Sequence, residues 1–298
     1  MLYFRNLMTI VREQGKILVN ALPQEAVIAN IVRRILRIIR EEYDELNTTQ
    51  TNVHQSKQID ECQAQSLQKL ITQNSERSGN TDSYSNNHAE LREHLVNHLD
   101  EIQNELQLSN ENLSLQAPEH IHSSEIILTL GYSKSVESFL KAVPKKRKFE
   151  VVVAECAPNC RGHILAASLA KEGIETTLIP DSTIFAMMSR VNKVIIGTHS
   201  VLANGGLRAA SGGFTVALAA KHYSVPVIVL VPMFKLSPVF LCNFEQEAFN
   251  LVGNTESVLP YNTKISRSVK AYSPVSDYVP PELITLFISS SYVFEIIY

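Results

Sequence analysis

Two cysteines four positions apart form the pattern in this sequence that most suggests chemistry. Cys156 and Cys160 follow an apolar run at 149–155, and Arg161 and His163 come directly after them. A nucleophilic thiol needs a nearby cation or a helix amino terminus to lower its pKa. A redox pair usually has two intervening residues rather than three, and a zinc site needs two further ligands, which do not appear at a suitable spacing. The pattern favours structural thiols, with thiol chemistry as the alternative.

Two further polar residues follow apolar runs in the same half of the chain. Asp181 comes after the run at 175–180 and precedes a serine and a threonine, so capping of the next helix is the simpler interpretation and a catalytic carboxylate the alternative. His199 follows the run at 191–198, where a general acid or base could stand. The local sequence offers His199 no carboxylate, and a lone loop histidine is more often a surface or interface residue.

Glycines are concentrated after this histidine. Gly205, Gly206, Gly212 and Gly213 precede an expected helix, and together with Gly197 they could form a ligand loop whose amides cradle a phosphate. The chain lacks the dinucleotide fingerprint after a strand and the Gly-Lys-Ser/Thr ending of a P-loop. Tight turns and close helix–sheet packing explain these glycines equally well.

The elements that must position these residues alternate between two patterns. Strands are expected at 125–130, 149–155, 175–180, 191–198, 225–232 and 283–289, and helices at 132–143, 163–172, 182–190 and 213–223. This alternation predicts an α/β fold, with a Rossmann-like parallel sheet covered by helices on both faces. The carboxyl ends of parallel strands meet at one edge, where small molecules or partner chains usually bind.

The amino-terminal part of the chain is expected to be helical instead. Apolar residues recur at helical spacing from Ile28 to Ile39 and again from Leu91 to Leu106. The two stretches are separated by a polar segment, at about 46–87, that is expected to be a disordered insert. We therefore expect a helical domain at 1–122 and a Rossmann-like domain at 123–298. The apolar tail SSYVFEIIY suggests a truncated or altered carboxyl end.

Composition limits the function further. The chain has 298 residues and a net charge of −3, which argues against a protein dominated by nucleic-acid binding. The basic run at 145–148 is most simply a solvated loop, with nucleic-acid contact or a nuclear signal as the alternative. No signal peptide is expected at the start, and the longest apolar run, at 225–231, is too short to cross a bilayer. Four scattered cysteines indicate reduced thiols in the cytosol, and neither a metal nor a cofactor is expected.

Several long segments together resemble one family. They are VAECAPNCRGH (153–163), GIETTLIPDSTIFAMMSRVNKVIIGT (173–198), LANGGLRAASGG (202–213), LAAKHYSVPVIVLVPMFKLSP (218–238) and DYVPPELITLFIS (277–289). They are similar to the beta-type members of the regulatory-subunit family of the guanine-nucleotide exchange factor for eukaryotic translation initiation factor two. The resemblance covers most of the chain outside 46–87 and the last nine residues.

The resemblance extends to sugar-phosphate isomerases of the same architecture, and it implies that their chemistry is absent here. The isomerase cysteine falls at about Gly131, the isomerase aspartate at His199, and an Asn-Lys pair at Ala209 and Ala210. Gly131 has no side chain and His199 is no carboxylate. The resemblance therefore implies a non-catalytic subunit. An active isomerase, or a binding module with a vestigial sugar-phosphate or nucleotide pocket, is the alternative.

For partners, the resemblance implies a hetero-oligomer. The expected partners are the delta, alpha, gamma and epsilon subunits, with exchange activity in epsilon, and the initiation factor itself, especially its alpha subunit, whose phosphorylation the core senses under stress. No membrane and no direct nucleic-acid contact are expected. The candidate interface residues are Gly131, Tyr132, Ser133, His163, Thr198, His199 and Asn204.

Overall fold

The computed structural model describes residues 4–22, 25–55, 91–240, 252–262, 268–290 and 293–294. They belong to two compact units. The first is made of Met1–Gln24 and Ile28–Asn104, and the second of Glu25–Val27 and Glu105–Tyr298. A helix long and apolar enough to span a bilayer does not occur in the described part of the chain. The domain division expected at 122/123 remains a prediction.

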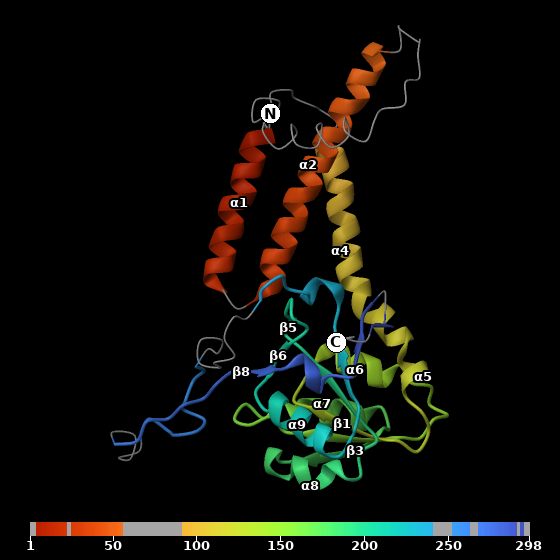
Figure 1. Ribbon diagram of the computed structural model, residues 1–298, viewed down its shortest axis with the longest axis vertical. Helices are drawn as coiled ribbons and strands as arrows, with labels where there is room; N and C mark the ends of the chain where they lie inside the picture. Colours follow the sequence, from red (N-terminus) through yellow and green to blue (C-terminus); the bar gives the residue numbers. More distant parts are fainter. Residues whose placement is uncertain are drawn as a thin grey trace. The chain divides into compact units, whose positions relative to one another are not determined.

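The helical unit is built from amphipathic helices that bury one face each. Helix α1 spans Phe4–Ala21, α2 spans Ala26–Gln55, and α4 spans Leu91–Leu115, of which residues up to Asn104 belong to this unit (Figure 1). Their apolar stripes meet in a small core made of Phe4, Met8, Ile39, Tyr43 and Leu91.

Helix α2 is longer than the sequence predicted. Residues 46–55, assigned above to a disordered insert, continue the helix to Gln55. Asn, Thr and Gln cost only a few tenths of a kcal/mol each relative to the best helix formers. A helix already nucleated by a packed amino-terminal half therefore extends through them. Residues 56–87, the rest of the expected insert, lie outside the described residues.

The second unit contains a seven-stranded sheet in the order β10-β9-β7-β4-β1-β2-β3. Six strands are parallel: β1 (Ile126–Leu130), β2 (Glu150–Ala154), β3 (Glu175–Ile179), β4 (Lys193–Gly197), β7 (Val227–Leu230) and β9 (Leu286–Ile288). The two residues of β10, Val293–Phe294, pair antiparallel with β9. The predicted α/β fold is confirmed.

Helices cover both faces of this sheet (Figure 1). They are α5 (Ala117–His120), α6 (Lys134–Lys141), α7 (Gly162–Lys171), α8 (Ile184–Met188) and α9 (Gly213–His222). Apolar residues of α8 and α9 share one core with alternate residues of the strands, and those of α6 and α7 share the other. Because both faces are buried, the inner strands β1, β2, β4 and β7 are mainly apolar, which is why the sequence predicted them well, whereas the edge strand β3 is partly exposed.

A second, three-stranded antiparallel sheet was not predicted. It consists of β5 (Ser200–Val201), β6 (Leu207–Ala210) and β8 (Ser276–Val279), in the order β5-β6-β8. Tyr278 of β8 pairs with Arg208 of β6 across the sheet. The 3₁₀ turns η1 (Asp181–Thr183), η2 (Met233–Lys235) and η4 (Pro281–Leu283) follow β3, β7 and β8.

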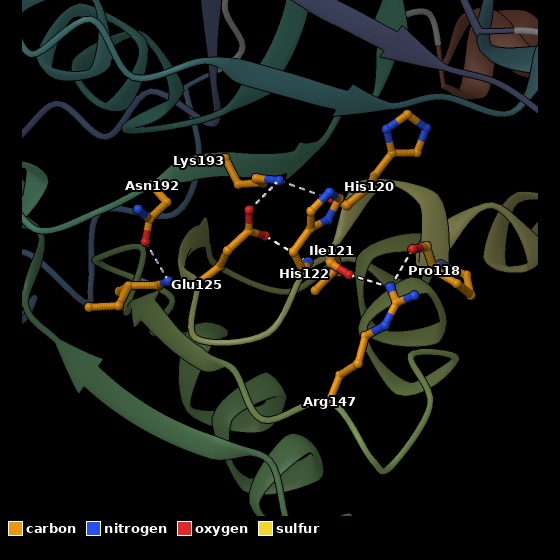
Figure 2. A network of polar contacts seen from close by, with 9 residues as sticks. Pro118, His120, Ile121, His122, Glu125, Arg147, Asn192 and Lys193 are labelled. Atoms are coloured by element: carbon orange, nitrogen blue, oxygen red, sulfur yellow. Dashed lines mark hydrogen bonds and ion pairs between the residues drawn. The ribbon is translucent and has the colours of Figure 1, made fainter.

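Polar contacts fix the chain that leads into the amino-terminal edge of the large sheet (Figure 2). Lys193 Nζ, at the start of β4, lies 2.9 Å from the Glu125 carboxylate and donates to the His120 carbonyl at 2.7 Å. Arg147 donates to the carbonyls of Pro118 and Ile121. Arg147 belongs to the basic run at 145–148, so one of its cations holds the fold together instead of facing solvent.

Candidate functional site

The strand order places the candidate site between β1 and β4. Numbered among the parallel strands alone, the order is 3-2-1-4-5-6, and chain connections leave β1 and β4 in opposite directions. Doubly wound sheets bind ligands outside the carboxyl ends of the strands at such a switch point. Gly131 follows β1 and Thr198 follows β4, so two of the predicted positions flank this point.

Space at the switch point is very limited. Gly131 has a φ of 61°, and a Cβ added there would lie 3.0 Å from the Cβ of Cys156. A Cβ on Gly197, at the end of β4, would lie 2.3 Å from the Ser133 hydroxyl oxygen. At Gly131 the left-handed backbone and the close neighbour both favour glycine, and at Gly197 the close neighbour does. The cysteine that the isomerases carry at about position 131 would be strained in this backbone.

The loop after β4 is held by hydrogen bonds to two backbone carbonyls. The buried Thr198 hydroxyl lies 2.9 Å from the Ser200 carbonyl and 2.8 Å from the Arg208 carbonyl, and it donates to them. The His199 amide donates to the same Arg208 carbonyl at 2.9 Å. The His199 side chain is exposed to solvent on one side. Nearby protein atoms remove part of its hydration, and this desolvation lowers the pKa of His199.

Cationic side chains lie around this loop. Lys235 Nζ donates to the Thr198 carbonyl at 2.8 Å. Burial lowers the pKa of Lys235, although the negative charge of Glu25 raises it in part. The positive charges of Lys235 and Arg208 also lower the pKa of His199. Arg208 and Lys235 were missed as site residues. They occur in LANGGLRAASGG and MFKLSP, and a basic residue within each otherwise apolar or small-residue segment was the available signal.

The first pair of predicted ligand-loop glycines forms a hairpin turn between β5 and β6. Gly205 has a φ of 79°, and its amide donates to the Leu202 carbonyl at 2.9 Å. Asn204 donates to the Tyr278 hydroxyl at 2.8 Å and accepts from the Gly206 amide at 3.0 Å. A Cβ on Gly206 would lie 2.5 Å from the Tyr278 ring. The turn is therefore packed against β8.

The second pair begins helix α9, and a carboxylate from β8 already occupies that helix terminus. Asp277 Oδ2 accepts hydrogen bonds from the Gly212 amide at 2.7 Å and the Phe214 amide at 3.4 Å. Burial raises the pKa of Asp277, against the lowering effect of these two hydrogen bonds. Gly213 packs tightly, since a Cβ there would lie 2.7 Å from the Ala209 Cβ. A phosphate would have to displace Asp277 to reach these amides.

Asp181 supports the turn after β2 and does not cap the helix that follows it. Its two carboxylate oxygens accept the amides of Cys156 at 2.9 Å and Ala157 at 2.7 Å. The helix-cap interpretation from the sequence is therefore wrong, because the carboxylate points across to the neighbouring strand end. Desolvation and the nearby Asp181 charge raise the pKa of Cys156 to about 11, so its thiol is protonated at neutral pH.

The remaining predicted residues lie at the same edge but are not joined into one site. Arg161 lies 5.5 Å above the Tyr132 ring, and a hydrogen bond with Glu137 raises the pKa of Tyr132. His163 stands near the start of α7, with Nε2 3.6 Å from Glu155 Oε2. These contacts place the candidate interface residues along the carboxyl edge of the large sheet and on the β5–β6 hairpin.

Fold and site together define a doubly wound α/β protein whose strand-end glycines are tightly packed and whose helix α9 begins at an internal carboxylate. The chain belongs to the initiation factor 2 subunit family, because the sequence model of that family matches residues 2–294. The resemblance inferred from the sequence is thereby confirmed.

Three individual proteins illustrate the relationship. Translation initiation factor eIF2B subunit beta of Dictyostelium discoideum is 40% identical over 304 residues, which cover 93% of this chain and 78% of the relative. The crystal structure of eIF2B beta from Chaetomium thermophilum matches with a TM-score of 0.69 at 27% identity, covering 98% and 76%. The tetrameric eIF2B-beta2-delta2 complex from C. thermophilum matches with a TM-score of 0.67 at 26% identity, covering 99% and 78%.

Proposed function

We propose that this chain is a non-catalytic, beta-type regulatory subunit of the exchange complex for translation initiation factor two. The observation that carries the proposal is the similarity to beta subunits over nearly the whole chain. The site geometry supports the non-catalytic part. Gly131 has no side chain and lies close to Cys156, His199 stands at the position of the isomerase carboxylate, and Asp277 fills the helix terminus where a phosphate would bind. These features weigh against an isomerase and against a vestigial sugar-phosphate pocket at α9.

In this proposal the chain pairs with a delta-type subunit, and the pair joins alpha, gamma and epsilon subunits in the cytosol. The solved beta2-delta2 assembly, a structural match to this chain, supports the first step. Nucleotide exchange takes place on the epsilon subunit. The helical region at 1–122 helps to contact the initiation factor and to sense phosphorylation of its alpha subunit.

The candidate interface is the carboxyl edge of the large sheet. Its proposed members are Gly131, Tyr132, Ser133, His163, Thr198, His199 and Asn204. His199 and His163 are exposed, and the loops that carry them are held by backbone hydrogen bonds. Rigid exposed loops suit a subunit interface because little conformational entropy is lost when a partner covers them. The cations Arg208 and Lys235 beside His199 favour an acidic partner surface.

The proposal is tested by nucleotide release from the initiation factor. The chain alone is expected to leave the release rate unchanged, whereas omitting it from a reconstituted complex lowers the rate and removes its sensitivity to phosphorylation. Acceleration by the chain alone, or a complex indifferent to its omission, would contradict the proposal. For the interface, His199→Glu is expected to weaken binding to the delta-type subunit. The matched control is His222→Glu, at an exposed histidine on the carboxyl end of α9, which leads to the opposite edge of the sheet.

A further inference from the structure

The turn between β2 and α7 brings three metal-binding side chains together. Glu155, Cys160 and His163 each offer one ligand atom, and these atoms all lie within 4.8 Å of one another. Glu155 Oε2 and His163 Nε2 are 3.6 Å apart. We propose that these three residues bind a zinc ion. The sequence pattern pointed to Cys156 and Cys160 as a pair, whereas the structure brings Cys160 together with Glu155 and His163 and leaves Cys156 out.

The backbone of the turn fixes the positions of the three ligands. The Gly162 amide donates to the Glu155 carbonyl at 3.0 Å, and the His163 amide donates to the Cys160 carbonyl at 3.2 Å. A Cβ on Gly162 would lie 2.4 Å from the Ala154 carbonyl oxygen, so only glycine allows helix α7 to begin this close to β2. The ligands are therefore held near one another before any ion arrives, which lowers the entropic cost of binding.

The donor atoms suit zinc in kind and in spacing. Carboxylate, thiolate and imidazole are the usual zinc ligands, and a thiolate disfavours magnesium and calcium. Zinc–ligand bonds of about 2.0–2.3 Å in a tetrahedron place ligand atoms roughly 3.3–3.6 Å apart. The pair formed by Glu155 and His163 already has this separation, and Cys160 Sγ, within 4.8 Å of both, needs to move by at most roughly 1.4 Å to complete the set.

Solvent can reach the three ligands. Glu155 and Cys160 are half-buried and His163 is exposed, so an ion can enter without unfolding the turn. Cys160 Sγ makes a weak hydrogen bond to the Pro158 carbonyl at 3.7 Å, which the thiol gives up when it binds zinc and releases its proton to solvent. Three protein ligands leave the fourth position of a tetrahedral ion open to water or to a group from a partner.

The test is calorimetric titration of zinc into the full metal-free chain, purified without a metal-affinity tag. One equivalent is expected to bind. Glu155→Gln, Cys160→Ser and His163→Gln are each expected to weaken binding at least about 100-fold, since even outer-shell partners of a metal contribute 10- to 100-fold. Cobalt titration gives an independent readout, because a thiolate ligand produces a charge-transfer absorption band that Cys160→Ser removes.

The matched control is Cys156→Ser, which changes the other cysteine of the same turn. Its thiol donates to the Ser211 carbonyl at 3.4 Å and is no part of the trio. Unchanged zinc affinity in this variant, with loss in the three ligand variants, supports the proposed site. Circular dichroism of each variant verifies that it is folded. Absence of stoichiometric binding to the native chain, binding that survives Cys160→Ser, or equal loss in Cys156→Ser would overturn the proposal.

Discussion

Removal of the Asp277 side chain is expected to destabilise the α/β unit through the start of helix α9. The Asp277 carboxylate accepts one well-formed hydrogen bond, from Gly212 at 2.7 Å, and one long one, from Phe214 at 3.4 Å. In Asp277→Ala both amides lose this acceptor. Loss of a helix-capping side chain costs about 0.5–2 kcal/mol, and an unsatisfied buried donor about 1–3 kcal/mol. Because the second bond is long, we expect a loss of about 1–2 kcal/mol.

Asp277→Asn separates the hydrogen bonds from the charge. The amide oxygen still accepts, and no ion has to be desolvated, so the change in unfolding free energy at pH 7 is expected to stay within about 0.5 kcal/mol. Burial raises the folded-state pKa of Asp277 above its ordinary value of 3.8. As the pH falls through that raised pKa towards 3.8, the native state takes up a proton and gains stability. The free energy of unfolding of the native protein therefore rises relative to that of Asp277→Asn as the pH falls.

Urea unfolding followed by circular dichroism measures these differences. At a slope of about 2 kcal/mol per molar urea, Asp277→Ala shifts the midpoint by roughly 0.5–1 M. Asp100→Ala, at an exposed acidic residue of α4, is the matched control and is expected to change stability by less than about 0.5 kcal/mol. Asp277→Ala with native stability would refute the assignment of this carboxylate to the α9 terminus.

Three further predictions concern other titratable groups. Desolvation lowers the pKa of His98, but its contacts with Glu42 and Glu101 outweigh this and raise the pKa. The stabilisation that His98 gives the helical unit is therefore complete below its ordinary pKa of 6.5 and is lost as the pH rises through the raised value. The melting temperature of His98→Ala should lack this pH dependence. Lys193→Met leaves the Glu125 carboxylate without its cation and should lower the free energy of unfolding by about 1–3 kcal/mol, measured in urea. An unchanged unfolding midpoint would contradict the network in Figure 2. With a pKa of about 11, only about 0.03% of Cys156 is thiolate at pH 7.5, so mass spectrometry should find it alkylated much more slowly than a free thiol peptide, and equal rates would refute its burial.

The large sheet could be predicted from the sequence because its inner parallel strands are buried on both faces. Stretches such as 151–154 and 194–196 are apolar throughout, and helical segments separate them, so both the elements and their order along the chain were evident. The small sheet could not be predicted. Its strands have two to four residues each, and β6 pairs with β8, which comes 65 residues or more later in the chain.

The candidate site was predictable in location and less so in its contacts. The carboxyl edge follows from the strand order, and Gly131, which the resemblance singled out, and His199 follow β1 and β4 at that edge. Asp181 was misassigned because its carboxylate bonds to amides of the neighbouring strand end, which sequence adjacency does not show. Asp277 was missed for the same reason, since it reaches α9 from a strand that the sequence did not reveal.

Size-exclusion chromatography with light scattering tests the proposed role most directly. The chain is measured alone and mixed with a delta-type subunit at the same concentration. A stable mixed complex, which His199→Glu weakens and His222→Glu does not, is the expected result for an assembly subunit. A well-behaved species that has the same mass with and without the delta-type subunit would contradict the proposed role.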